Sequence, residues 1–344
     1  MKTFKRSKAI GFFDEDFRLG KLSQLGDPLE RLSKGIDFEI FRPILTEKLH
    51  VEPKNKGGRR PYDYILMMKI LVLQRYYNIS DDQAEYQICD RLSFMRFLGL
   101  TIADDVPDSK TIWLFRERLT DLGLVEILFD TFIKKLEELN LIIHEGKIID
   151  ASFVEVPRQR NRRDENAQIK AGETPQEWLS EPNKLAQKDT DARWTKKNEE
   201  TFYGYKNHIK ADSKSKLITA YEVTDASVHD SQPTCALLDA KDEDQPLHID
   251  SAYVGETLDK KLREEKKVIP QVIEKGYRSN PLTEDQKKSN KEKSRTRVRV
   301  EHIFGFVENS MNGSFIKSIG KQRCTAIIGL INLVYNLFRK TQIA

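Results

Sequence analysis

The chain has few cysteines and no long apolar run, and these two features argue against a disulfide-rich secreted protein and a membrane-spanning protein. Its three cysteines, Cys89, Cys235 and Cys324, are far apart and odd in number. This spacing fits neither a zinc site nor a disulfide framework, and it indicates a reducing compartment such as the cytoplasm. No apolar stretch reaches the ~20 residues that a membrane-spanning helix needs, so we expect no membrane partner. The first residues lack the apolar centre of a signal peptide.

A glycine-rich nucleotide-binding loop is also missing, so we expect no nucleotide cofactor. The 344 residues are enough for roughly two domains, and 38% of them are apolar and 33% charged. Apolar runs recur along the whole length, which argues against a disordered chain.

Positive charge is concentrated in two segments. The formal net charge of +4 is by itself a weak argument for a nucleic-acid partner. However, seven cations and one acid lie between Lys287 and Arg299, and four cations with no acid lie in 54–60. Clustered cations suit a phosphate backbone, although a solvated charged face explains them equally well. The candidate contacts in these segments are Arg59, Arg60, Lys293 and Arg295.

Helical periodicity dominates the first ~145 residues. Ser80 and Gln83 form a capping-box pattern that opens a helix, and Gly99 is its expected end. Asp108 is expected to cap the next helix. Short helices with tight turns fit a DNA-binding helix-turn-helix or a helical packing domain, and periodicity does not choose between them.

The pattern changes to strands near residue 146. We expect strands over 146–156, 203–211, 217–224, 247–250 and 268–273, and helices over about 230–240, 256–265, the stretch around Glu301 and 325–338. The polar stretch of about 158–202 is too long for an ordinary loop and predicts an insertion or mobile segment. Trp178 and Trp194 within it are expected to pack, with base stacking as the alternative.

This order of elements describes a ribonuclease H-like fold with a mixed sheet flanked by helices. We therefore expect a mixed α and β protein, with an all-helical domain over 1–145 and a ribonuclease H-like domain over 146–344.

Three carboxylates form the candidate site. Asp150 and Asp250 each end an apolar run and precede two small residues, and Glu301 lies in a basic helical stretch. The expected sheet places both aspartates on adjacent strands, where a later helix can bring Glu301 to them. Converging carboxylates hold hard divalent cations, and paired cations catalyse phosphoryl transfer. The ordinary alternative for each aspartate is a turn or a helix cap.

Four further side chains are candidates. Arg297 shares a helix face with Glu301, so it forms either a surface ion pair or a phosphate contact beside a metal ligand. Lys206 and His208 face the same side of a strand, which is either solvated or in contact with DNA near the metals. Asp230 is expected to cap the helix that follows it.

Several segments match, in order, a pattern that extends over nearly the whole chain. They are Gly58-Arg59-Arg60-Pro61-Tyr62, 86–94 with Phe97-Leu98-Gly99, 106–111, Ile149-Asp150-Ala151-Ser152, 191–197, 203–208, His229-Asp230-Ser231, Asp250-Ser251-Ala252-Tyr253, and Arg297 with Val300-Glu301. Through these segments the chain resembles the DDE transposases of bacterial insertion sequences, of the insertion-sequence-five type.

The resemblance implies a helical domain that binds DNA ends and makes dimer contacts. It implies that Asp150, Asp250 and Glu301 hold two Mg2+ ions, for which Mn2+ can substitute. The implied partners are double-stranded DNA (the transposon inverted repeats and the target) and a second copy, as a homodimer in the synaptic complex. The implied location is the bacterial cytoplasm, in association with the nucleoid.

The last helix departs from the family pattern at two positions. Arg297 and Glu301 match, but Ser294 stands where a Tyr is expected and Glu308 where a Lys is expected. Because the Lys is expected to contact DNA phosphate, an acid at 308 would repel that phosphate.

We therefore expect cut-and-paste transposition, in which cleavage at the transposon end frees a 3′-hydroxyl that attacks target DNA. One alternative is a structure-selective nuclease with the same fold, which would not join a pre-cleaved end. The other is a transposase-derived DNA-binding protein with weakened catalysis, which the residues at 294 and 308 would favour.

Overall fold

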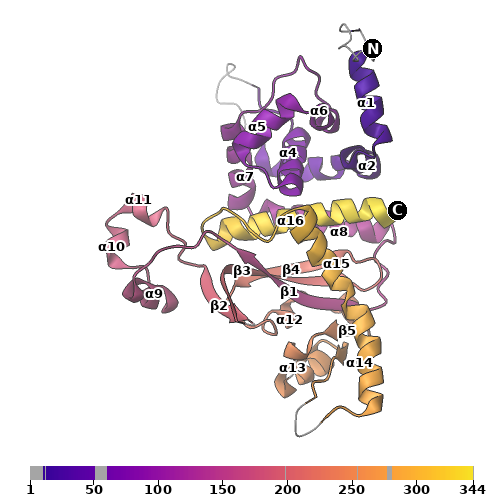
Figure 1. The fold of residues 1–344 in the computed structure, drawn as a ribbon, viewed down its shortest axis with the longest axis vertical. Helices are drawn as coiled ribbons and strands as arrows, with labels where there is room; N and C mark the ends of the chain where they lie inside the picture. Colours follow the sequence, from indigo (N-terminus) through magenta and orange to yellow (C-terminus); the bar gives the residue numbers. More distant parts are fainter. Residues whose placement is uncertain are drawn as a thin grey trace, which may run out of the picture.

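The computed structural model of the protein describes residues 11, 13–50, 60–197, 199–253, 255–276 and 281–343. Figure 1 shows a helical N-terminal region above a sheet, with the C-terminal helix between them. The helices of the first region are α1 (Asp14–Gln24), α2 (Pro28–Gly35), η1 (Phe38–Phe41), α3 (Arg42–Leu49), α4 (Tyr64–Tyr77), α5 (Asp81–Asp90), α6 (Leu92–Leu98), α7 (Ser109–Asp121) and α8 (Leu124–Glu138). The candidate Arg59 lies outside the described residues.

Local capping signals set the ends of several of these helices. Ser80 and Gln83 form the expected capping box of α5, and the Asp108 carboxylate accepts a hydrogen bond from the Thr111 amide at the start of α7. Gly99 ends α6 in the left-handed region, with a φ of 77°. The expectation of one helix between Ser80 and Gly99 is wrong, because the backbone becomes extended at Arg91 and separates α5 from α6.

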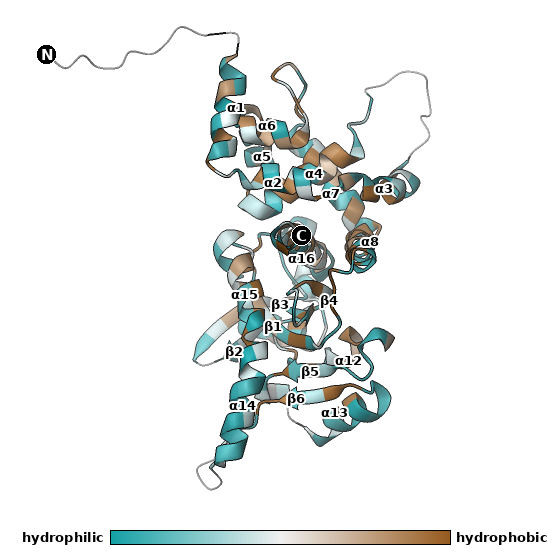
Figure 2. Cartoon of the chain, turned by 90° about the vertical axis from the view of Figure 1, so that its right-hand side faces the viewer, coloured by the Kyte–Doolittle hydropathy of each residue, from teal (hydrophilic) through white to brown (hydrophobic). Residues whose placement is uncertain are grey.

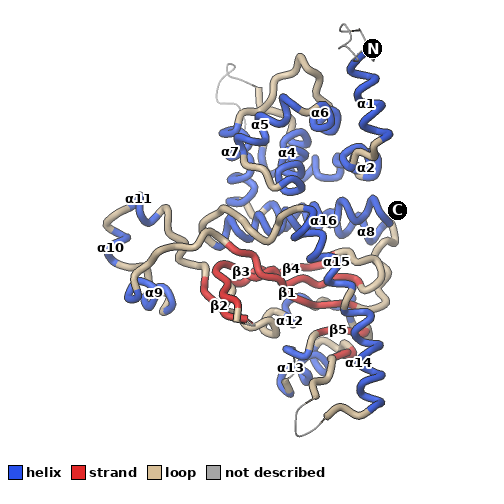
Figure 3. Tube along the Cα trace, in the orientation of Figure 1, coloured by secondary structure: helices blue, strands red, loops and turns tan. Residues whose placement is uncertain are grey.

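The described residues form one mixed sheet in the order β2-β3-β1-β5-β6, with β4 paired to β3 (Figure 3). Its strands are β1 (Lys147–Glu155), β2 (Arg193–Lys197), β3 (Glu200–Asp212), β4 (Ile218–Asp225), β5 (Pro246–Ile249) and β6 (Ile269–Val272). Strand β1 is antiparallel to β3 and parallel to β5, and β5 is parallel to β6. This is the mixed sheet flanked by helices that the element order predicts.

The insertion between β1 and β3 is folded. It contains α9 (Arg163–Lys170), α10 (Gln176–Leu179), α11 (Pro182–Leu185) and β2, which pairs with β3. Trp178 is fully buried, and its indole N–H donates to Glu165 at 2.8 Å, so the packing role expected of it is confirmed. Trp194 is partly exposed and packs against Tyr203. Strand β2 is an element that its polar sequence did not predict.

The remaining elements follow β4. They are α12 (Thr234–Leu237), η2 (Ala240–Asp242), η3 (Ser251–Tyr253), α13 (Glu256–Lys260), the π-helical turn η4 (Lys261–Glu265), α14 (Glu284–Arg297), α15 (Arg299–Gly305), the π-helical turn η5 (Phe306–Ser310) and α16 (Lys321–Ile343). The helix expected over 230–240 is reduced to α12, which begins after Pro233. Asp230 therefore does not cap it, and instead accepts a hydrogen bond from Lys206.

Helix α16 joins the helical region to the sheet. Its residues from Ala326 to Phe338 are buried, and Figure 2 shows it with α8 between the upper helices and the strands. One apolar cluster includes residues of α4, α8, β3 and α16, so the core is continuous across residue 145, where we expected a domain boundary. No described helix combines the length and apolar character needed to cross a bilayer.

Candidate active site

The sheet brings Asp150 and Asp250 to the same level. Strand β1 pairs Lys147 with Leu247 and Ile148 with His248 of β5. The same offset, continued by two residues, places Asp150 beside Asp250. Both strands are parallel, so the two carboxylates emerge at the same end of the ladder, as the sequence pattern predicts.

Both aspartates are oriented in the same way. The Oδ1 atom of Asp150 accepts the backbone N–H of Ala151 at 2.9 Å, and the Oδ1 atom of Asp250 accepts that of Ser251 at 2.7 Å. In each residue the Oδ2 atom is therefore left for a partner other than the backbone. A small side chain follows each aspartate and leaves space on that side.

Glu301 approaches from the helices that follow the sheet. Helix α15 buries Val300 and Ile303, which fix the helix against the core and leave Glu301 directed outward, with 57% of its side chain exposed. Val298 separates α14 from α15, so Arg297 ends one helix and Glu301 lies in the first turn of the next.

The three carboxylates converge on the guanidinium group of Arg297. Its Nη2 atom lies 3.0 Å from Asp150 Oδ2 and 3.8 Å from Asp250 Oδ2. Its Nη1 atom lies 3.7 Å from Glu301 Oε1. Side chains from β1, the end of β5, and the α14–α15 junction thus meet at one point, although these three regions are distant in sequence.

Burial and charge act in opposite directions on Asp150. Its side chain is only 14% exposed, and this desolvation raises the pKa of the carboxyl to about 6. The Arg297 guanidinium and the Ala151 amide favour the ionised form, while the nearby Glu301 and Asp250 carboxylates oppose it. A bound divalent cation would favour ionised Asp150, because the single positive charge of Arg297 does not balance the three carboxylates that face it.

The donor set suits a hard divalent cation. Carboxylate oxygens are the ligands that Mg2+ prefers, and Asp150, Asp250 and Glu301 supply them from three separate elements. In the present arrangement, no group of three or more His, Cys, Asp or Glu side chains within the described ranges is spaced to hold a metal ion. The three carboxylates thus have the chemistry that the metal requires, but in this arrangement the Arg297 guanidinium lies between them.

Lys206 and His208 are corrections to the sequence interpretation. Lys206 is buried, and its Nζ donates to Val228 O at 2.6 Å and to Asp230 Oδ1 at 2.7 Å. His208 is 0% exposed and lies 2.9 Å from the Thr224 hydroxyl, and burial lowers its pKa to about 4. Buried side chains held by internal partners do not contact DNA in this conformation.

The other candidate contacts lie at the surface or near it. Arg60 and Arg295 are exposed, whereas Lys293 is half-buried and donates to Val272 O at 3.0 Å. The substituted position Glu308 is exposed on the π-helical turn η5. It lines a cavity of about 340 Å³ with Ser152 and Phe304, on the part of β1 that follows Asp150.

Two residues near the site were not identified as functional from sequence. Tyr253 is buried three residues after Asp250, and its hydroxyl has no hydrogen-bond partner among the described residues. Burial, with the charges of Asp150 and Asp230, raises the pKa of Tyr253. The second residue is Asp230. Both it and Tyr253 belong to the segments that match the family pattern, and that match was the feature of the sequence that could have identified them.

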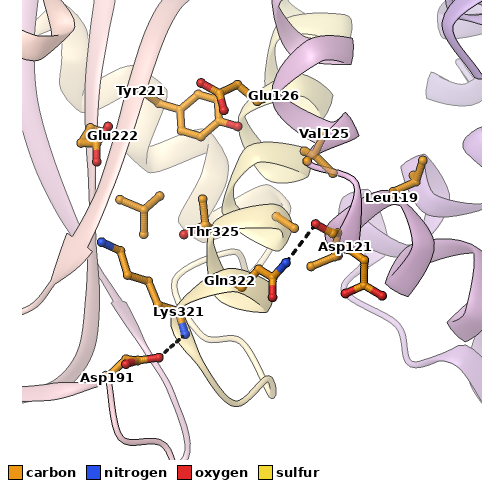
Figure 4. Close-up of a pocket in the computed structure, with 14 residues that line it drawn as sticks. Leu119, Asp121, Val125, Glu126, Asp191, Tyr221, Glu222, Lys321, Gln322 and Thr325 are labelled. Atoms are coloured by element: carbon orange, nitrogen blue, oxygen red, sulfur yellow. Dashed lines mark hydrogen bonds between the residues drawn. The ribbon is translucent and has the colours of Figure 1, made fainter. Parts of the chain in front are cut away.

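A larger cavity than the one beside Glu308 lies elsewhere. Its volume is about 700 Å³, and it opens between the α7–α8 junction, β4 and the start of α16 (Figure 4). Asp191 Oδ2 accepts the Lys321 backbone N–H there at 2.9 Å. None of the three site carboxylates lines this cavity, so its size does not make it the reaction centre.

A mixed sheet that brings three carboxylates from two adjacent strands and a following helix to one point fits an enzyme of phosphoryl transfer, a class that commonly uses carboxylate-bound metal ions. Residues 143–337 match the family described as Transposase DDE domain, and residues 17–118 match the Transposase domain (DUF772). The chain belongs to the DDE transposases, of the insertion-sequence type. This family acts on DNA and uses divalent metal ions.

The chain is also similar to a protein in a solved structure, described as "Cryo-EM structure of piggyBac transposase synaptic complex with hairpin DNA". The two are 15% identical, the match covers 92% of this chain and 75% of that one, and the TM-score is 0.44. The narrower assignment to the insertion-sequence-five type stays a prediction.

Proposed function

We propose that this transposase cleaves DNA at transposon ends and transfers the freed 3′-hydroxyl strand into target DNA, with Mg2+ as its ion. The observation that carries the proposal is the convergence of Asp150, Asp250 and Glu301 on one guanidinium. Bound Mg2+ would supply Lewis acidity to the attacking and leaving oxygens.

The chain's own residues have separate tasks in this proposal. Asp150 of β1 and Asp250, directly after β5, would bind the ions, and Glu301 would complete the ligand set from α15. The cations of α14 would hold the DNA backbone beside the site, because they lead directly to Arg297 along one helix.

The proposal includes a dimer of this chain on DNA, since two transposon ends must be joined to one target. It also places the reaction in the bacterial cytoplasm. Both points derive from the family resemblance, and sedimentation of the protein with and without terminal-repeat DNA tests the first of them.

Glu301→Gln tests the site, and Glu308→Gln is its matched control. Both variants remove one exposed carboxylate from neighbouring turns, but only Glu301 lies at the converging point. With Mg2+ and a terminal-repeat duplex, Glu301→Gln should lose at least ~100-fold in cleavage and strand transfer. Near-wild-type activity of Glu301→Gln would sink the proposal.

The alternatives give different patterns in the same assay. A nuclease would cleave but would not join a pre-cleaved end to target DNA. A DNA-binding protein with weakened catalysis would bind the duplex without Mg2+-dependent cleavage. For the latter, Glu308→Lys should restore activity, because it returns the expected cation to η5.

A further inference from the structure

The guanidinium of Arg297 occupies the position that a metal ion would share with its ligands. Its two terminal nitrogens lie within 3.0–3.8 Å of oxygens from Asp150, Asp250 and Glu301. One positive charge therefore faces three carboxylates. Each carboxylate directs one oxygen at the guanidinium, and both aspartates hold their other oxygen on a backbone N–H.

Arg297 is held there mainly by charge. Only the contact with Asp150 has hydrogen-bond geometry, and the contacts with Asp250 and Glu301 are longer. Its Nε–H is buried and has no hydrogen-bond partner within the described residues. A buried donor without a partner is unfavourable, so this position of Arg297 is only partly satisfied.

We propose that Arg297 is an internal counter-ion that competes with divalent cations for the carboxylates of Asp150, Asp250 and Glu301. This inference rests on the proposed function, because it takes these carboxylates as the metal ligands. It assigns Arg297 a role that precedes any contact with DNA, namely to set the metal affinity of the free protein.

The competition follows from geometry and charge. Mg2+ binds carboxylate oxygens at about 2.0–2.1 Å and requires near-octahedral geometry. The oxygens that would bind it are the ones now turned toward the guanidinium. Two cations cannot share these oxygens at such separations without strong repulsion, so metal binding requires the Arg297 side chain to withdraw.

Withdrawal of the side chain is compatible with the local fold. Arg297 is the last residue of α14, and no residue of that helix is buried. Glu301 is anchored separately, through the buried Val300 and Ile303 of α15. The guanidinium can therefore move without disturbing the backbone that positions the ligands.

Mg2+ titration of the full chain by isothermal calorimetry, without DNA, tests the proposal. Arg297→Gln should bind Mg2+ on the order of tenfold more tightly than the wild type, because the competing cation is gone. Arg295→Gln is the matched control, since it removes the same charge from an exposed position two residues earlier on α14. Its Mg2+ affinity should stay within about twofold of the wild type.

Arg297→Lys covers the case in which Arg297→Gln does not fold. It keeps the charge but loses the planar fork, and it should bind Mg2+ no more than about threefold more tightly than the wild type. The proposal is overturned if Arg297→Gln binds Mg2+ no more tightly than Arg295→Gln, or if Arg297→Lys, which keeps the competing charge, binds Mg2+ on the order of tenfold more tightly than the wild type. Circular dichroism before each titration establishes that the variant is folded.

Glu301→Gln in the same titration separates this inference from the proposed function. If Glu301→Gln leaves Mg2+ affinity unchanged, the metal site itself is wrong and both proposals fail. If Glu301→Gln weakens Mg2+ binding but Arg297→Gln does not tighten it, only the counter-ion role of Arg297 fails.

Discussion

Lys206 Nζ lies 2.7 Å from Asp230 Oδ1, and both side chains are largely withdrawn from solvent. The lysine comes from the middle of β3 and the aspartate from the turn after β4. The same lysine also donates to the backbone oxygen of Val228. The pair therefore attaches the chain after β4 to the face of the sheet that also carries His208.

Lys206→Met should destabilise the protein by about 3–5 kcal/mol, because it leaves a largely buried carboxylate without its counter-charge. Urea denaturation at neutral pH measures the change. The double variant with Asp230→Asn should recover part of the loss, since it removes the unpaired charge. Lys34→Met is a control, because Lys34 is 75% exposed and its ion pair with Glu30 should contribute under about 1 kcal/mol. If Lys206→Met leaves stability unchanged and weakens DNA binding, Lys206 is a DNA contact, as the sequence alone suggested.

Local patterns predicted the elements that carry Asp150 and Asp250. Each aspartate follows a run of apolar residues, and such a run between turn signals is typical of a buried strand. The caps at Ser80 and Asp108 were also predictable, because a cap depends on side chains and amides only three residues apart. These features need no knowledge of the distant chain.

Partners distant in sequence were not predictable in the same way. Strand β2 has the polar sequence Arg-Trp-Thr-Lys-Lys, and its conformation comes from pairing with β3 rather than from its own residues. Lys206 and His208 are polar residues at alternate positions of a strand. The same pattern arises whether that face is solvated or buried with its charges paired, so the sequence does not distinguish the two. Lys206 is bonded by the chain after β4 and His208 contacts Thr224 of β4, so the partners of both lie at a distance in sequence.

His208 should make stability depend on pH. Its folded pKa is lowered to about 4 by burial, while the unfolded side chain titrates near 6.5. The full contribution is present above pH 6.5, and it is lost as pH falls toward 4, because only the unfolded chain binds the proton in that range. Asp230 opposes this shift and Lys206 reinforces it.

The measurement is urea unfolding of the wild type and His208→Gln between pH 7.5 and 4.5. Relative to the variant, the wild type should lose up to about 1.4 kcal/mol of unfolding free energy per pH unit below 6.5. Other titrating groups contribute to both proteins and cancel in the difference. A constant difference across this range would show that His208 has the same pKa in the folded and the unfolded protein.

Asn336 of α16 binds the edge of the sheet as another strand would. Its Oδ1 accepts the Ile218 N–H at 2.9 Å, and its Nδ2 donates to Ile218 O at 2.8 Å, in a fully buried setting. Asn336→Leu should cost about 2–4 kcal/mol in urea denaturation, because two backbone groups lose their partners.

The neighbouring pair Asn207 and Asn332 provides the contrast. These two side chains bond each other at 2.8 and 3.1 Å, so both partners can be replaced together. The double variant Asn207→Leu with Asn332→Leu should therefore cost less than Asn336→Leu alone. If the double variant costs more than Asn336→Leu, then changes in packing, rather than unsatisfied backbone groups, determine the loss of stability at α16.

The basic face of α14 should determine how DNA binding responds to salt. Arg295 is exposed on a helix that buries none of its residues, so its side chain is accessible to a phosphate backbone. Arg295→Ala should reduce the slope of log affinity against log salt by about 1, because one fewer counterion is released. Fluorescence anisotropy on a terminal-repeat duplex at several salt concentrations measures it. Lys34→Ala removes the same charge from α2 and should leave the slope unchanged. Equal slopes for Arg295→Ala and Lys34→Ala would place the DNA away from α14. Because Arg297 ends the same helix, its side chain would then be too far from the DNA to contact a phosphate after it withdraws from the carboxylates.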